Sequence, residues 1–299
     1  NTKHSPKNTV ANAAHKELGL FHHKPKAGIT GDATTKFWAT VASNPEVSSE
    51  VKALATEALN HDFGTDQKSA HNTQTIISKF LKDNNIADTQ KSTLGDWQAS
   101  GAKNSQGMED KYMYSRIKIN ASLAKLRGED MASLRKSEGQ HWQGRGASQF
   151  HEAWDEGSND AMALIPYIAA SQQQVKSLTN STGTINRIYR GLQGDIAPIL
   201  KGARKAALKA GPGVVKEIWL GGGLQGWSMN KSTSKSIGAG SDGVLMSKEN
   251  IAPEDILLYF NAFSNSHTGE AELALDPNSH AWFSPNEVDH AGTDGWGGN

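Results

Sequence analysis

Residues 185–191 read Ile-Asn-Arg-Ile-Tyr-Arg-Gly, and this stretch marks the change from helical to strand-like sequence. β-Branched and aromatic residues dominate it and a glycine ends it, which predicts a β-strand. Further short strand-like runs, separated by Gly and Ser, are expected at 214–220, 224–229, 243–246, 255–260 and 270–275. Between the first two strands, Asp195 can cap a helix that extends to Ala210.

The sequence before this stretch predicts helices instead. Apolar residues recur at helical spacing in 45–60, 70–81, 112–126 and about 158–178. Helices first and short strands later are typical of an α+β fold. The turn-rich residues 91–109 predict a boundary between a helical N-terminal domain or arm, 1–95, and a second domain, 100–299.

Composition narrows the possible functions. The chain has 299 residues, and its 31 Lys and Arg balance its 31 Asp and Glu, so nucleic acid is an unlikely partner. The absence of cysteine excludes disulfides, thiolate metal sites and cysteine nucleophiles. No apolar run is long enough to span a bilayer, and no signal peptide is recognisable. We therefore expect no membrane partner and no bound metal.

Three features of the strand-rich half are candidates for chemistry. Arg190, at a strand end before Gly191, can offer a fixed fork to a phosphate, although a surface arginine before a turn has the same pattern. A hydroxyl from the Ser- and Thr-rich stretch 227–234 can hold a carboxylate in place, although the stretch also suits a polar loop. Glu270 and Glu272 would share one face of a strand, and two carboxylates in one cleft can divide the work at a glycosidic bond. About one such Glu-x-Glu is expected by chance in a chain of this length.

The order of these features resembles the arginine-serine-glutamate class of mono-ADP-ribosyltransferases, which includes clostridial binary toxins and enzymes carried in bacteriophage virions. Tyr189-Arg190-Gly191 comes first, Trp227-Ser228 follows and Glu270-Ala271-Glu272 comes last. The resemblance covers about residues 100–285 and implies a core of two β-sheets with flanking helices. The motif serine usually lies in Ser-Thr-Ser directly after an aromatic residue. Here Ser228 follows Trp227, while Ser232 and Ser234 belong to a literal Ser-Thr-Ser, so the choice among the three stays open, with Ser228 favoured.

The resemblance also implies roles. NAD⁺ would be the co-substrate, with Arg190 on its phosphates and the Gly191 backbone on the nicotinamide amide. Ser228 would orient Glu272, and Glu272 would accept a hydrogen bond from the ribose and stabilise an oxocarbenium-like sugar. Glu270 would bind and deprotonate an acceptor arginine, with residues 261–269 as the target-recognition loop and 231–241 as a mobile loop beside nicotinamide.

The partner expected from this reading is a target protein that presents an arginine, and the chain is expected to act as a monomer in a host cytoplasm after delivery by a virion or by secretion. Two alternatives use the same residues. Water could replace the arginine, which would make the protein an NAD⁺ glycohydrolase. The chain could also be a non-catalytic virion or partner-binding protein. The target, and the role of residues 1–95, have no signal in the sequence.

Overall fold

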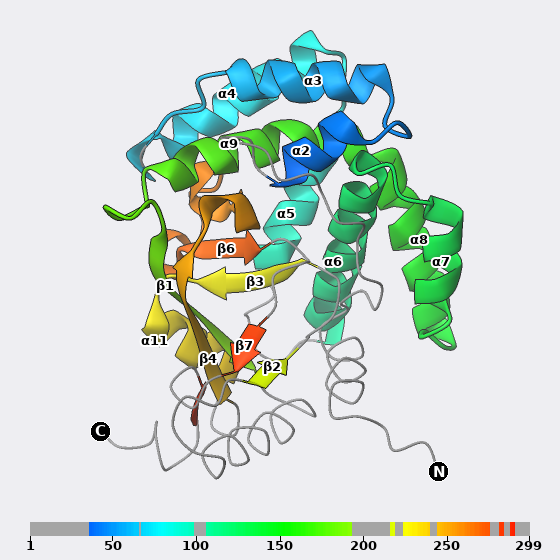
Figure 1. Cartoon of the computed structure of the whole chain (residues 1–299). Helices are drawn as coiled ribbons and strands as arrows, with labels where there is room; N and C mark the ends of the chain where they lie inside the picture. The colour runs from blue at the N-terminus through cyan, green and yellow to red at the C-terminus, as the bar shows by residue number, and fades with distance from the viewer. Residues whose placement is uncertain are drawn as a thin grey trace.

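The computed structural model describes residues 36–65, 67–98, 106–192, 216–218, 224–239, 244–275, 281–283 and 288–290. Helices make up the described chain as far as Lys176, and short antiparallel strands dominate the rest (Figure 1). The predicted α+β class is therefore confirmed. The first 35 residues of the predicted N-terminal domain or arm, 1–95, and the predicted helix 195–210 lie outside the described residues.

The helices before the sheet are α2 (Lys36–Ser43), α3 (Ser49–Asn60), α4 (Ala70–Asp83), α5 (Gln90–Gln98), α6 (Gln106–Leu126), α7 (Met131–Gly139), α8 (Arg145–Asn159) and α9 (Ile165–Lys176). Side chains fix several of their first turns. Ser48 accepts a hydrogen bond from the Val51 backbone at the start of α3, and Asp130 accepts one from Ser133 at the start of α7. Such caps satisfy backbone donors that a helix cannot pair internally.

The predicted helix 158–178 is wrong at its start. The structure has α8 to Asn159, a 3₁₀ turn η3 (Ala161–Leu164) and then α9. Pro166 lies in the first turn of α9, the helical position in which proline breaks no hydrogen bond. The chain is thus redirected before the proline instead of passing through it in one helix.

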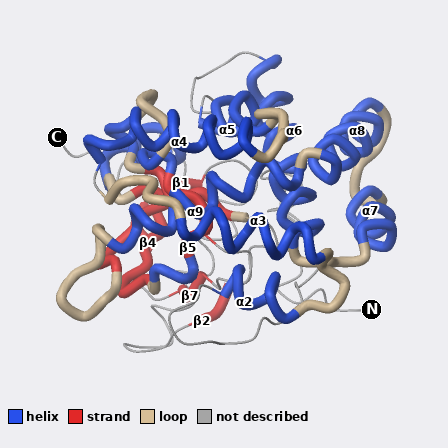
Figure 2. Tube along the Cα trace, turned by 90° about the horizontal axis from the view of Figure 1, so that it is seen from above, coloured by secondary structure: helices blue, strands red, loops and turns tan. Residues whose placement is uncertain are grey.

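Helix α9 is the centre of the fold. Nearly all of its residues are buried, because α3 and α4 pack on one side of it and strand β5 (Ile256–Tyr259) on the other. Seen from above, α3, α4 and α9 cover the strands (Figure 2). Helix α6 packs against α5 and α8, and α7 and α8 lie at the far edge of the molecule (Figure 1).

The main sheet has six strands in the order β5-β6-β3-β1-β4-β8, and all of its pairs are antiparallel. Its strands besides β5 are β1 (Ile185–Leu192), β3 (Gln225–Ser228), β4 (Val244–Ile251), β6 (Glu272–Leu275) and β8 (Val288–His290). A separate pair joins β2 (Lys216–Ile218) to β7 (Ala281–Phe283). Strands β1 and β3, far apart in the sequence, are therefore neighbours at the centre of the sheet.

Helices and sheet share one core in the described part of the chain. A single cluster of buried apolar residues includes Phe37 of α2, Ile77 of α4, Ile168 of α9 and Leu273 of β6. The predicted boundary near residues 95–100 falls at the end of α5. Part of the predicted turn-rich linker is helical, because α5 covers its first residues and α6 its last.

Candidate functional site

Three predicted site residues meet on neighbouring strands. In the register of the sheet, Tyr189 of β1 is opposite Ser228 of β3, and Ser228 is opposite Glu272 of β6. Arg190 directly follows Tyr189 on β1 and is buried. Adjacent side chains of a strand alternate between faces, yet the Arg190 charge lies close enough to lower the pKa of Glu272. The motifs that the sequence separates by about 40 residues thus form one row at the end of these strands.

Glu272 is enclosed by a side chain from outside the sheet. Trp97, in α5, donates a hydrogen bond from its indole Nε1 to Glu272 Oε1 at 2.7 Å. Residue Glu272 keeps partial contact with solvent, but its carboxyl group packs against Trp97 and Gly226. Burial raises the pKa of this carboxyl to about 8, because the charged form loses water. The Trp97 hydrogen bond and the charges of Arg116 and Arg190 oppose the rise, whereas the Glu270 charge adds to it.

The Arg116 guanidinium packs over the ring of Trp97. The guanidinium lies 4.6 Å from the centre of the Trp97 ring, within cation–π distance. It is fully buried, and Nη2 donates to the backbone carbonyl of Leu224 at 2.6 Å, immediately before β3. Asn120, one turn later on α6, accepts from the backbone of Leu224 at 2.8 Å. Helix α6 therefore holds both the indole and the start of the strand that carries Ser228.

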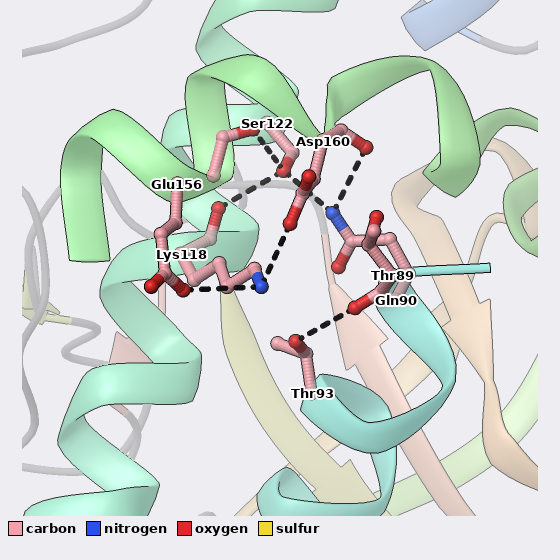
Figure 3. A network of polar contacts seen from close by, with 8 residues as sticks. Thr89, Gln90, Thr93, Lys118, Ser122, Glu156 and Asp160 are labelled. Atoms are coloured by element: carbon pink, nitrogen blue, oxygen red, sulfur yellow. Dashed lines mark hydrogen bonds and ion pairs between the residues drawn. The ribbon is translucent and has the colours of Figure 1, made fainter. Parts of the chain in front are cut away.

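A partly buried polar network fixes the N-terminal end of α5 (Figure 3). Gln90 donates to Ser122 Oγ of α6 at 2.9 Å and to the carbonyl of Asp160 at 3.2 Å. Lys118 of α6 bridges Asp160 at 2.8 Å and Glu156 at 3.3 Å. Gln90 thus joins α5 to α6 and to the end of α8, and Lys118 joins α6 to the same end of α8. These bonds hold α5, and Trp97 with it, in a fixed position.

Glu270 is placed differently from the prediction. The strand begins at Glu272, and Glu270 ends a 3₁₀ turn, η7 (Thr268–Glu270). Ala271 between the two glutamates has a left-handed backbone, with φ 45°, so the alternation of a strand does not apply. The predicted shared strand face is therefore wrong, although the two carboxyl groups remain close enough to influence each other's charge.

Glu270 has a histidine partner. His267 Nδ1 lies 3.1 Å from Glu270 Oε1, and the two side chains are 48% and 21% exposed. Partial burial raises the pKa of Glu270, while His267 opposes the rise. This pair is more open to solvent than the carboxyl of Glu272.

The serines of the hydroxyl stretch make different contacts. The Ser228 hydroxyl donates to the backbone carbonyl of Glu270 and accepts from the Asn230 backbone at 2.8 Å. Its link to Glu272 therefore runs through the backbone of the turn, while Trp97 makes the direct bond. Ser234 donates to the carbonyl of Tyr189 at 3.0 Å, and Ser232 bonds to Asn230.

The two loops predicted beside the site contain helical turns. Within the predicted mobile loop, 231–241, residues 231–239 form α11 (Lys231–Thr233) and the π-helix η4 (Ser234–Ala239), and the last two residues lie outside the described part. The predicted recognition loop, 261–269, begins in the 3₁₀ turn η6 (Phe260–Ala262) and ends in η7. Asn230 caps α11 by accepting hydrogen bonds from the backbone of Ser232 and Thr233, which explains why this polar stretch is helical.

Sequence reasoning missed Trp97, Arg116 and His267. Trp97 lies in the predicted linker, and Arg116 lies at helical spacing from Ile119 and Leu123 but is charged, so the apolar pattern does not include it. His267 has a weak signal, because it is three residues before Glu270, the first residue of the Glu-x-Glu motif.

Comparisons with known proteins give no family for this chain. No family model, no curated protein and no solved structure matches it. Within the described ranges, side chains of His, Asp and Glu form no group suited to a metal ion. Of the helices that the structure describes, none has the length and apolar character needed to cross a membrane.

Proposed function

We propose that this protein is a mono-ADP-ribosyltransferase that cleaves NAD⁺ and transfers ADP-ribose to an arginine of a target protein. One observation carries the proposal: Tyr189, Ser228 and Glu272 occupy one row across three neighbouring strands, with the Arg190 charge close to the Glu272 carboxyl. The motif order in the sequence supports it independently, since nothing in that order requires the motifs to meet in space.

The chemistry of Glu272 supports the same reaction. Cleavage of the nicotinamide bond builds positive charge on the ribose, and a fixed carboxylate beside it stabilises that charge. A carboxylate in a largely desolvated position does so better than one in water. The indole N–H of Trp97 donates to the ionised carboxylate of Glu272 and stabilises it. Because the indole carries no charge, the negative charge of the carboxylate is not cancelled.

Each remaining residue has a role in the proposal. Arg190 and the Gly191 backbone would bind the phosphates and the nicotinamide amide of NAD⁺. Ser228 would fix the turn that carries Glu270, through the Glu270 carbonyl. Glu270, the more exposed acid, would face the acceptor arginine, because a carboxylate binds and aims a guanidinium.

The test is turnover of NAD⁺ labelled in its adenosine part. Released nicotinamide is quantified by chromatography, and labelled proteins in bacterial and eukaryotic lysates are identified by mass spectrometry of modified peptides. We expect arginine-linked ADP-ribose, and about a 10²–10³-fold loss of nicotinamide release in Glu272→Gln. Glu57→Gln, an exposed change on α3, serves as the matched control and should keep full activity.

Three outcomes oppose the proposal. Equal turnover by the wild type and Glu272→Gln would remove Glu272 from its role. Nicotinamide release without any labelled protein would indicate an NAD⁺ glycohydrolase. Absence of turnover in both proteins would favour a binding protein.

A further inference from the structure

The turn that carries Glu270 has an unusual backbone. His267 and Ala271, which flank η7, both have positive φ angles, 56° and 45°, although neither is glycine. Such conformations are strained for residues other than glycine and persist where the surrounding structure enforces them. This turn is therefore held in shape from outside.

The contacts that enforce it come from two segments, residues 228–230 and Asn261. The carbonyl of Thr268 accepts from Asn261 at 3.0 Å, and that of Gly269 accepts from Asn230 at 3.0 Å. The carbonyl of Glu270 accepts from Ser228, and that of Ala271 accepts from the Met229 backbone at 3.2 Å. Because the carbonyls of residues 268–271 are all hydrogen-bonded, the backbone that carries the side chains of His267 and Glu270 is fixed.

The same turn brings the imidazole of His267 against the carboxyl of Glu270. Because Nδ1 is bonded to the carboxylate, Nε2 is the nitrogen that can meet an incoming group. A carboxylate on one imidazole nitrogen fixes the tautomer and makes the other nitrogen a better base. At 48% exposed, the His267 side chain is accessible to a protein substrate.

We infer that His267 is the general base of the acceptor half of the reaction, oriented by Glu270. The inference rests on the proposed function and names the group that accepts the proton lost by the acceptor arginine. A guanidinium is protonated and is a poor nucleophile until it loses a proton. Glu270 has a carboxylate suited to binding the guanidinium, and His267 has a ring nitrogen, Nε2, suited to accepting the proton.

The step balances. The arginine nitrogen forms a bond to C1′ of the nicotinamide ribose as the C1′–nicotinamide bond breaks, and the electron pair of that bond leaves with neutral nicotinamide. The proton displaced from the arginine nitrogen passes to His267 Nε2 and then to water. The product guanidinium keeps its positive charge.

The experiment compares transfer with hydrolysis in the full chain. The acceptors are agmatine and poly-L-arginine, and released nicotinamide is measured with and without them. The variant is His267→Asn, because Asn tolerates a left-handed backbone while it lacks a basic nitrogen. We expect its ADP-ribosyl transfer to fall by about 10²-fold or more, while nicotinamide release without acceptor stays near the wild-type rate.

A second variant tests the base directly. His267→Gly keeps the positive φ and leaves space for a small molecule. Added imidazole should restore part of its transfer and should leave His267→Asn unchanged. His71→Gln, an exposed change on α4, is the matched control and should transfer normally.

The outcomes separate the inference from the proposed function. Failure of the wild type to modify either acceptor or any lysate protein would overturn both. Transfer by His267→Asn at the wild-type rate would overturn the base role alone. An equal loss of transfer and hydrolysis would overturn it too, because His267 would then act on the nicotinamide side or on folding.

Discussion

Trp97 and Glu272 are 175 residues apart in the sequence and are joined by a hydrogen bond of 2.7 Å between the indole nitrogen and the carboxylate. The bond connects the helical half of the chain to the strand that carries the proposed catalytic acid. Burial raises the pKa of Glu272 to about 8, and the hydrogen bond from Trp97 opposes this rise. The charge state of this carboxyl is therefore set by both halves of the molecule.

Replacing Trp97 by Phe should make Glu272 harder to ionise. The ring beside Arg116 is kept and only the N–H is lost, so the ionised form loses about 1.5–3 kcal/mol of hydrogen bonding. The pH at which NAD⁺ turnover is half-maximal should move upward, with at least about a tenfold loss at pH 7. Trp154→Phe, in the separate cluster around α6 and α8, should leave the pH profile in place. An unchanged profile in Trp97→Phe would contradict the role given to the indole.

Stability should depend on pH through Glu272. The carboxyl titrates near 4.5 when unfolded and near 8 when folded, so in this window the native state holds a proton that the unfolded chain has lost. The free energy of unfolding should therefore fall as pH rises through the window, by on the order of a few kcal/mol for this group. Glu272→Gln has no carboxyl to titrate at this position. Its free energy of unfolding should therefore rise relative to that of the wild type between pH 5 and pH 9. Urea unfolding of both proteins at the two pH values measures the difference, and parallel behaviour would argue against a buried carboxyl.

Gly226→Ala should disturb the site with little effect on the fold. A Cβ there would lie 3.0 Å from Glu272 Oε1, so the carboxylate would have to shift by a few tenths of an ångström, while its 3.7 Å distance to the Trp97 ring is an ordinary contact. NAD⁺ turnover should fall by about tenfold or more, since small misplacements at a reacting group are costly. Gly95→Ala is the matched change in α5, where a Cβ meets open space, and should raise the melting temperature slightly. Full activity in Gly226→Ala would show that the carboxylate can shift without consequence.

Gly157→Ala should destabilise the helical half. A Cβ at this position of α8 would lie 2.1 Å from the backbone carbonyl of Lys118, so α6 and α8 would have to separate. The network of Lys118, Glu156 and Asp160 would be stretched at the same time. We expect a loss of about 2–4 kcal/mol in urea unfolding. Gly146→Ala, on the same helix with a nearest contact of 3.3 Å to Trp142, should cost much less; equal losses would point to helix propensity rather than to the clash.

Much of the fold could be predicted because its signals are local. The helices at 49–60 and 70–83 follow apolar spacing, and β1 follows the run of β-branched and aromatic residues at 185–191. Helix α5 was missed because Gly95 and polar residues on both sides of it resemble a turn, and its stability comes from Gln90 and Trp97 packing into the rest of the protein.

The candidate site was predictable in its residue types and less so in its geometry. The order of Arg190, Ser228 and Glu272 is a sequence property, and their meeting on adjacent strands follows from pairings that the order does not specify. Glu270 was assigned to the strand because alanine at 271 has no local signal for a left-handed backbone. Two of the contacts that hold this turn come from Ser228 and Asn230, which lie 42 and 39 residues from their partners and cannot be inferred from spacing. The third comes from Asn261, seven residues from its partner Thr268.

The position of Trp97 also limits how the chain can be divided. The segment that resembles a transferase starts at about residue 100, yet the donor that faces its acid belongs to α5, which ends at Gln98. A shortened chain that began after α5 would contain every recognised motif and would still lack the indole that keeps Glu272 ionisable. If the protein is the proposed transferase, we therefore expect a minimal active fragment to start before Gln90. The strands grafted alone onto another protein would carry Glu272 without the indole that lowers its pKa.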